Sequence, residues 1–370
     1  MTKIFLLEGN TPVALFEAYS SFSWNRKLYS PSSAEMTINS RLDQAELIEA
    51  GLDLGIIDSP SGITLPELVL TVEDIERTAT SDGSDNQTVH CVEAGMLHVR
   101  RCLPPPYEPP FNDSHIEVNG SVEEFMKEIV DKNAGPGAPS SRRVSGLQIA
   151  TNLDRGPSRV YRARFQGVSE RLEQVGKDSG IGWEVRLEGN DIEFDIIEGV
   201  DRSNEVMFDI SYDTALEIEK EAMNSDSRNV SYVAGQGQGV DRTVLEISQG
   251  SPEGRNRRET FIDARDTEDN DELESRGSEE LSSRIQQDRI TVEAFPYGPV
   301  RYREHYDLGD LVRLRHLPWG VNVVKRIVEV QQEIDPSRGT SQISLVLDKP
   351  PATLRQRMQE ELEGRGSQRS

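Results

Sequence analysis

Short runs of alternating apolar residues dominate both ends of this chain, whereas helix signals lie mostly in its middle. Near the N-terminus, residues 3–7 and 13–16 flank a polar turn, and alternation continues over residues 34–38. A period of two is typical of strands with one buried face. Longer runs follow at residues 65–75 and 87–99. We therefore expect a hairpin followed by more antiparallel sheet in the first hundred residues.

Prolines end this strand-rich block, because a proline has no backbone N–H to donate to a neighbouring strand. They stand at positions 104–106 and 109–110. We place the first domain boundary there and expect an N-terminal tube-like β domain over residues 1–104.

Two short helices and a hairpin are predicted over residues 105–205. Ser121 with Glu124 three residues later marks the start of the first helix, and the second helix covers residues 169–177. Alternating apolar residues on both sides of Gly189-Asn190 are the pattern of a two-residue hairpin. This part of the chain is therefore predicted to be a small mixed α/β domain.

Strands are expected again over residues 206–350, a C-terminal β-rich domain with a second tube-like barrel. The predicted strands are residues 206–210, 229–234, 242–248, 290–295, 311–314, 321–330 and 341–347. Residues 215–223 are expected to form one or two helical turns, and residues 279–286 a helix after an acidic stretch. Residues 351–370 should form a short helix and a polar tail.

These segments together predict a mixed, β-rich α+β fold. Two tube-like antiparallel β-barrel or β-sandwich domains would flank the small α/β domain. The order of strand-rich and mixed segments also suggests that the two ends are similar to each other.

The formal net charge of −24 comes from 65 acidic and 41 basic residues, and it disfavours binding to nucleic acid or anionic lipid. No run approaches the roughly 18 apolar residues of a membrane-spanning helix, and the N-terminus lacks a leader-like pattern. We expect the chain to fold in the cytoplasm of the cell that makes it. Cys91 and Cys102 are expected to be buried, reduced thiols rather than a disulfide.

The segment Asn229–Arg242, followed by Arg258–Asp266, resembles a hub family of long-tailed phages. Segments that agree in order are residues 180–202, 308–312 and 326–330. The residues that carry the motif are Gly235, Gly237, Gly239, Asp241, Arg242, Asp263, Arg265, Asp266, Gly309 and Asp310. The chain thus resembles the siphovirus baseplate hub or tail-tip proteins, the Gp37-like minor tail proteins, which are related in architecture to contractile-phage hubs.

This resemblance implies a structural protein of the virion and not an enzyme, with no cofactor. Three copies, each with two tube-like domains, would match a sixfold tail tube above and a threefold tip below. The implied partners are tail-tube proteins, spike, fibre or receptor-binding proteins, and DNA passing through a channel without specific binding. Because the chain ends at Ser370, any lytic activity is expected on another polypeptide.

Two alternative functions stay open. One is a tail-associated hydrolase of cell wall or capsule, although no nucleophile motif is present and no carboxylate pair stands out. The other is the hub of a phage-derived injection particle, which would share the architecture and differ in cargo.

Three patterns suggest ligand sites, and each has a simpler explanation. The glycine run at 235–239 lacks the helix and third glycine of a dinucleotide loop, so close strand packing and positive φ angles explain it better. A solvated loop is favoured over a hard-cation site for the acidic residues Asp263, Asp266, Glu268, Asp269, Asp271 and Glu272. Zinc at His90, Cys91, His98 and Cys102 is disfavoured, because alternating strand faces would separate them.

Two sets of apolar residues remain. Trp24, Trp183 and Trp319 are expected to fill core volume, with interface or sugar-stacking roles as the lesser alternative. A stripe of Leu354, Met358 and Leu362 is predicted to lie on one face of the C-terminal helix. That helix is expected to dock on its own chain, or else to recruit a fibre or spike partner.

Overall fold

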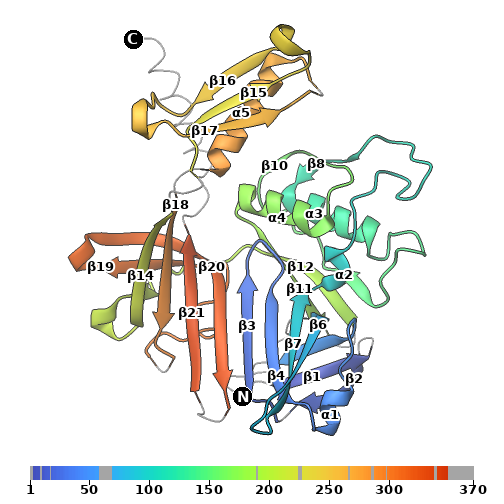
Figure 1. Ribbon diagram of the computed structural model, residues 1–370, viewed down its shortest axis with the longest axis vertical. Helices are drawn as coiled ribbons and strands as arrows, with labels where there is room; N and C mark the ends of the chain where they lie inside the picture. The colour runs from blue at the N-terminus through green and yellow to red at the C-terminus, as the bar shows by residue number, and fades with distance from the viewer. Residues whose placement is uncertain are drawn as a thin grey trace. The chain divides into compact units, whose positions relative to one another are not determined.

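The structure is a computed structural model (Figure 1). It describes residues 3–8, 11–16, 18–57, 69–188, 191–223, 227–265, 267–284, 287–296, 298–336 and 340–348. Strands predominate over helices, which confirms the β-rich mixed fold class. In the described residues no helix is long and apolar enough to cross a membrane. The chain divides into two compact units, residues 1–218 with 292–370 and residues 219–291, while the boundaries expected at 104, 205 and 350 stay predictions.

The N-terminal part of the larger unit is the expected antiparallel sheet. Its elements are β1 (Lys3–Glu8), β2 (Thr11–Phe16), β3 (Ser21–Lys27), β4 (Ser33–Asn39), α1 (Asp43–Glu46), β5 (Asp53–Ile57), β6 (Val69–Ala79) and β7 (Asp85–Glu93). β1 pairs with β2, and β6 with β7, across the predicted turns. Along β3, alternate residues Phe22, Trp24 and Arg26 are buried, as the period of two requires.

The predicted strand over residues 87–99 is only half correct. β7 ends at Glu93, and a one-turn helix, α2 (Gly95–His98), follows Ala94, whose φ is +48°. Leu97 of this turn is fully buried in the core of the middle α/β part. The apolar residues after Glu93 therefore leave the sheet to fill the neighbouring core, a tertiary effect that alternation does not reveal.

The middle α/β part contains the two expected helices and the expected hairpin. It comprises β8 (Ile116–Ser121), α3 (Val122–Asn133), β9 (Leu147–Ile149), β10 (Ser158–Ala163), α4 (Val168–Ser179), β11 (Gly182–Glu188) and β12 (Asp191–Ile197). The Ser121 hydroxyl accepts a hydrogen bond from the Glu124 N–H at 3.1 Å, which confirms the predicted N-cap. β11 and β12 pair as predicted, and Gly189-Asn190 lie outside the described residues.

The C-terminal strands of the larger unit correct one helix prediction. They are β13 (Met207–Phe208), β14 (Ala215–Met223), β18 (Gln287–Ala294), β19 (Leu311–His316), β20 (Val321–Asp335) and β21 (Thr340–Asp348), with 3₁₀ turns η1 (Ile210–Tyr212) and η4 (Leu317–Trp319). Residues 215–223 are a strand and not helical turns, because β14 pairs with β18. Sheet pairing overrides the helix propensity of their Glu, Lys and Ala residues.

The strand-rich ends of the chain join in one sheet. Among the described residues it has 13 strands in the order β14-β18-β21-β20-β3-β4-β7-β6-β5-β1-β2, and β19 and β13 branch from β20. β3 and β20, far apart in sequence, pair antiparallel from Lys27 with Glu329 to Phe22 with Ile334 (Figure 1). Of the predicted barrel or sandwich domains, the barrel form is wrong for the described strands, since their sheets are not closed and β14 and β2 lie at the two ends. The arrangement of two tube-like domains stays a prediction.

The smaller unit is a three-stranded sheet with one helix. Its strands are β15 (Val230–Ala234), β16 (Val244–Ser248) and β17 (Glu259–Asp263), in the order β16-β15-β17, with η2 (Gly239–Asp241) and η3 (Gly254–Asn256) between them. α5 (Asn270–Ser283) packs Leu273 against Val233 and Ala264. The helix begins well before the predicted residue 279, because the Asp269 carboxylate caps it by accepting from the Asp271 N–H.

A buried glutamine supports the join between β3 and β20. The indole N–H of Trp24 donates to Gln332 Oε1 at 2.8 Å, and Gln332 Nε2 donates to Ser341 Oγ at 3.2 Å. We predict that Gln332→Leu leaves the Trp24 N–H unpaired and lowers the free energy of unfolding by about 2 kcal/mol, measured by urea denaturation. Gln331→Leu, on the exposed side of β20, is the control and should change it by less than about 0.5 kcal/mol. Equal effects would contradict the role of this contact.

Candidate functional site: a charged junction in the larger unit

Three of the motif segments meet at one place in the larger unit. Leu311 N–H donates to the Val200 carbonyl, and Arg202 N–H to the Leu311 carbonyl, both at 2.9 Å. Gly309 and Asp310 exchange backbone hydrogen bonds with Ile327, also at 2.9 Å. The segments 199–202, 309–312 and 326–330, separate in sequence, are therefore neighbours in the fold.

The Asp310 carboxylate lies at the centre of this meeting point. It is buried and accepts hydrogen bonds from the Val200 N–H at 2.7 Å, and from Arg202 Nε and the Asp307 N–H, both at 2.9 Å. Gly199 packs so closely that a Cβ would lie 2.0 Å from the Gly309 carbonyl oxygen, and its φ is +72°. Any larger residue at 199 would push these segments apart.

Arg26 joins the same junction to the N-terminal sheet. From β3 its Nη1 donates to Tyr302 Oη at 2.6 Å and to Asp307 Oδ1 at 2.7 Å, and its Nη2 contacts Glu184 Oε2 at 3.0 Å. Burial would lower the pKa of Arg26, but the contacts with Tyr302, Asp307 and Glu184 raise it well above its ordinary value. One buried cation thus contacts the N-terminal strands, the middle α/β part and the C-terminal loop.

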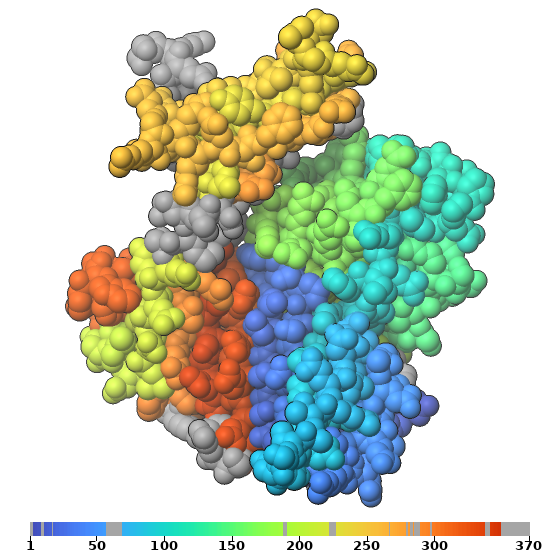
Figure 2. Space-filling model, in the orientation of Figure 1, coloured from blue at the N-terminus to red at the C-terminus, as the bar shows by residue number. Residues whose placement is uncertain are grey.

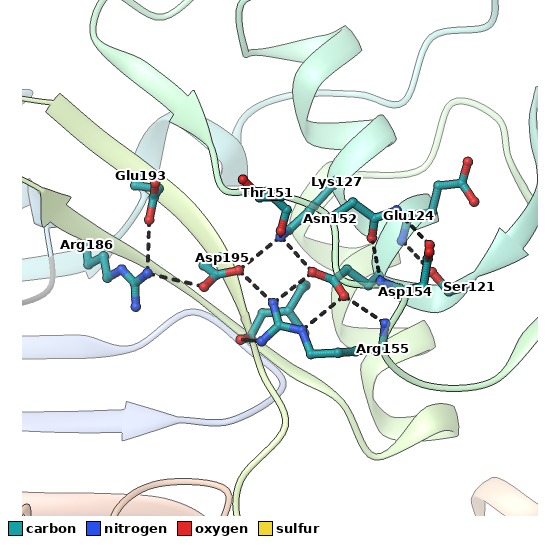
Figure 3. A network of polar contacts seen from close by, with 12 residues as sticks. Ser121, Glu124, Lys127, Thr151, Asn152, Asp154, Arg155, Arg186, Glu193 and Asp195 are labelled. Atoms are coloured by element: carbon teal, nitrogen blue, oxygen red, sulfur yellow. Dashed lines mark hydrogen bonds and ion pairs between the residues drawn. The ribbon is translucent and has the colours of Figure 1, made fainter.

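Ion pairs continue from Glu184 into the middle α/β part. Arg186 contacts Glu184 Oε1 at 3.6 Å and Asp195 Oδ2 at 3.2 Å. Asp195 Oδ1 also contacts Lys127 at 3.0 Å and Arg155 at 2.8 Å. Figure 3 shows Arg186 on one side of Asp195 and Lys127 with Arg155 on the other. Charges of alternating sign thus run from Glu123 on α3 through Arg26 to Asp307, and the Asp307 backbone N–H links this series to Asp310 and its partner Arg202.

Glu123 is the buried end of this series. Its carboxylate accepts from Lys127 Nζ at 2.7 Å and from three nitrogens of Arg155, at 2.8, 2.8 and 3.0 Å. Burial alone would raise the pKa of Glu123, but the hydrogen bonds from Arg155 and Lys127 outweigh it and lower the pKa to about 2. The carboxylate is therefore charged at neutral pH.

A second buried carboxyl, Glu93, behaves in the opposite way. It accepts from the Ser32 N–H at 2.9 Å and the Val185 N–H at 2.8 Å, so it links the N-terminal sheet to β11. No cation contacts it in any hydrogen bond or ion pair between described residues. Burial raises the pKa of Glu93 to about 7, against the lowering effect of these hydrogen bonds.

The motif residues of the smaller unit gather around Arg242. Its Nε and Nη2 donate to the carbonyls of Gly235 and Ala234, each at 2.8 Å, and Nη2 also pairs with Asp263. Asp263 is also 3.2 Å from Arg265 Nε. Arg242 therefore ties the glycine loop to β15 and β17.

The remaining motif residues lie around this arginine. Gly237 and Gly239 have φ angles of +118° and +59°, and the strand β16 follows the loop. A Cβ on Gly235 would lie 2.9 Å from the Leu273 side chain of α5. Asp241 is exposed, and Asp266 lies outside the described residues. The junction at Gly309 and Asp310 belongs to the larger unit, so the motif residues are divided between the two units.

Residues of the ligand sites suggested by the sequence make other contacts in the fold. Among the described residues no three His, Cys, Asp or Glu side chains are placed to hold a metal. In the acidic segment, Glu272 accepts from the Thr267 hydroxyl at 2.7 Å and pairs with Arg276 at 2.6 Å. Cys91 and Cys102 are buried free thiols, as predicted. His90 instead lies 3.5 Å from Glu35 at the surface.

One of the three tryptophans contradicts its prediction. Trp24 and Trp183 are buried as expected, but Trp319 is 50% exposed. It follows Pro318 in the η4 turn, outside the strands whose inner faces form the core. The C-terminal stripe at Leu354, Met358 and Leu362 lies outside the described residues.

Arg26, Glu93 and Glu184 were not among the residues predicted to form a site. A signal for Arg26 existed, because it occupies the inward position two residues after Trp24 in an alternating strand. An arginine at such a position must find buried partners. Those partners are 158 and 281 residues away along the chain, so no local pattern could name them.

We predict that Asp310→Asn destabilises the protein by about 3 kcal/mol, because the amide cannot accept all the hydrogen bonds that the carboxylate accepts and Arg202 loses the nearer of its two acidic partners. Denaturant unfolding measures this loss. The control is Asp201→Asn, at an exposed carboxylate in the same segment that accepts from the nearby Ser203 N–H at 2.9 Å. It should cost less than about 1 kcal/mol. Similar losses in both variants would show that Asp310 does not hold the junction.

Glu93 should make stability depend on pH near neutrality. A carboxyl whose pKa rises from 4.5 to about 7 on folding binds its proton more tightly in the folded state. Stability is therefore fully present below pH 4.5, and about 3 kcal/mol of it is lost as the pH rises to about 7.

The test compares unfolding free energies of Glu93→Gln and the unmodified chain between pH 5 and pH 8. We expect a smaller fall with pH in the variant, whatever its absolute stability. Glu76→Gln, on the exposed part of β6, is the control and should keep the slope of the unmodified chain. A slope unchanged by Glu93→Gln would contradict the assignment.

Comparison with solved structures shows which fold this arrangement builds. A 43 kDa tail protein of prophage MuSo2 from Shewanella oneidensis has a TM-score of 0.55 at 12% identity, with 94% of this chain and 98% of that chain covered. A tail protein from Neisseria meningitidis MC58 has a TM-score of 0.56 at 11% identity, with 95% and 99% covered. A lidless PdpA–VgrG complex has a TM-score of 0.50 at 8% identity, with 95% and 65% covered.

None of the curated proteins matches the sequence. The family model of the siphovirus ReqiPepy6 Gp37-like proteins matches residues 11–347, which includes the junction and the motif of the smaller unit. The family expected from the motif segments is confirmed, and this chain belongs to the Gp37-like tail proteins of siphoviruses.

Proposed function

We propose that this protein is the structural hub of a phage tail tip or baseplate. In this proposal three copies connect the tail tube to the distal spike or fibres and surround a channel for the genome. The match of residues 11–347 to a siphovirus tail family carries the proposal. The fold shared with two tail proteins over nearly their whole lengths supports it.

The continuous sheet of the larger unit supports a role in transmitting force along the tail. β3 and β20 join the two strand-rich ends by a ladder of backbone hydrogen bonds, and Arg26 and Asp310 hold the same parts together by side chains. A subunit so joined transmits force between its ends as one body. Its net charge of −24 suits a channel wall that does not retain DNA.

An injection particle derived from a phage is the second candidate. The likeness to a complex that contains VgrG favours it, although at 8% identity this likeness concerns the fold alone. Capsid and terminase genes beside the gene for this chain would favour the phage tail, and their absence would favour the injection particle.

We predict that the protein lies on the axis at the distal end of assembled tails. The measurement is electron cryomicroscopy of particles, with an epitope-tagged copy labelled in a parallel preparation. Three copies around the axis are the expected result, because the fold and family are those of tail proteins. A label spread along the tail, or absent from particles, would contradict the hub role. Zymography of the purified chain on cell-wall and capsule substrates tests the hydrolase alternative.

A further inference from the structure

The hairpin formed by β19 and β20 is rich in basic residues. The 16 residues from Leu311 to Arg326 include four basic residues and a histidine but none of the 65 acidic residues. Arg315 is partly neutralised, since its Nε lies 2.5 Å from Asp209 Oδ2. Asp201 attracts Arg313, and Lys325 also has an interaction within the chain. The hairpin nevertheless carries a local excess of positive charge in a protein whose net charge is −24.

The end of this hairpin also exposes large apolar side chains. Leu317 is 70% exposed and Trp319 50%, and Tyr212 from the adjoining η1 turn is 57% exposed. These three residues are here named the aromatic tip. In Figure 2 the orange-red end of the hairpin and the yellow-green residues after β13 lie side by side at the left edge. Scattered apolar residues need no explanation, but a cluster with tryptophan, tyrosine and arginine has the composition of interface hot spots.

The aromatic tip is held in place before any partner binds. The Gly320 N–H donates to the Leu317 carbonyl at 2.9 Å, and Gly320 has a φ of +65°, which closes the η4 turn. The rings of Trp319 and His316 are 4.1 Å apart. The guanidinium carbon of Arg315 lies 4.5 Å from the centre of the Tyr212 ring, over its face. A surface ordered in this way loses little conformational entropy on binding.

We propose that the aromatic tip and the basic side chains of the β19–β20 hairpin dock on an acidic surface of a second copy of this chain. Charge complementarity identifies the occupant, because a net charge of −24 makes another copy an acidic partner. The inference rests on the proposed assembly of several copies. DNA fits less well, since the whole chain repels phosphate and the exposed apolar rings favour a protein surface.

The first test measures self-association of the full chain by sedimentation velocity over a range of concentrations. We expect association that weakens as salt rises from about 50 mM to about 500 mM, because exposed charges are screened. The double variants Leu317→Ser/Trp319→Ser and Arg313→Glu/Lys325→Glu should each raise the dissociation constant about tenfold or more. Val99→Ser/Leu153→Ser, which replaces two other exposed apolar residues of the larger unit, is the matched control and should leave it within about threefold.

A carbodiimide cross-linker, which joins lysine amines to carboxylates, gives an independent readout. The chain has only 8 lysines, so a cross-link to Lys325 can be assigned by mass spectrometry. We expect cross-linked dimers in which Lys325 is joined to an Asp or Glu of another copy. Lys325→Arg keeps the charge but removes the amine, and should remove these dimers while association persists.

Three results would overturn the inference. Association unchanged in the Leu317→Ser/Trp319→Ser variant would show that the tip is not the contact. Association unaffected by Arg313→Glu/Lys325→Glu would show that the partner surface is not selected by its acidity. A chain that stays monomeric but binds a DNA duplex through this hairpin would assign the surface to nucleic acid. In each case the hub role survives if electron cryomicroscopy still places the protein on the tail axis.

Discussion

The larger unit depends on one buried guanidinium. The side chain of Arg26 extends from β3 of the N-terminal sheet and contacts Glu184 of β11 and Asp307 of the C-terminal loop. Three parts of the chain therefore meet at a single side chain. A cation can be buried there only because anions surround it on several sides. Removing either Glu184 or Asp307 leaves the buried cation only partly compensated.

Buried ion pairs add less stability than their distances suggest, because desolvation opposes the attraction. Ion pairs and their hydrogen bonds need specific distances and angles, however, whereas apolar contacts tolerate small shifts of one segment against another. We infer that the network from Glu123 to Asp310 mainly fixes the positions of the middle part and the two strand-rich ends. This constraint agrees with the family motif, since Gly199, Gly309 and Asp310 sit where the segments cross.

The acidic net charge of the chain and its basic hairpin both bear on how copies of the protein associate. A strongly acidic protein resists random association with itself. A basic hairpin with ordered apolar side chains at its end then favours contact through that surface. Affinity would come from the buried rings, and orientation from the charges.

Local sequence was enough to predict β1, β2, β4, β6 and most of β7, the Ser121 cap and the β11–β12 hairpin, because each depends on residues close together in the chain. It did not predict β3 or β5. The motif segments were also visible in sequence. Tertiary structure decided the rest. Residues 215–223 form the strand β14 because β18 pairs with it. The two strand-rich ends share one open sheet because β3 pairs with β20. Trp319 is exposed because its turn lies outside the strands that form the core. Arg26 acquired its role only when folding brought together partners more than a hundred residues apart, which no local pattern encodes.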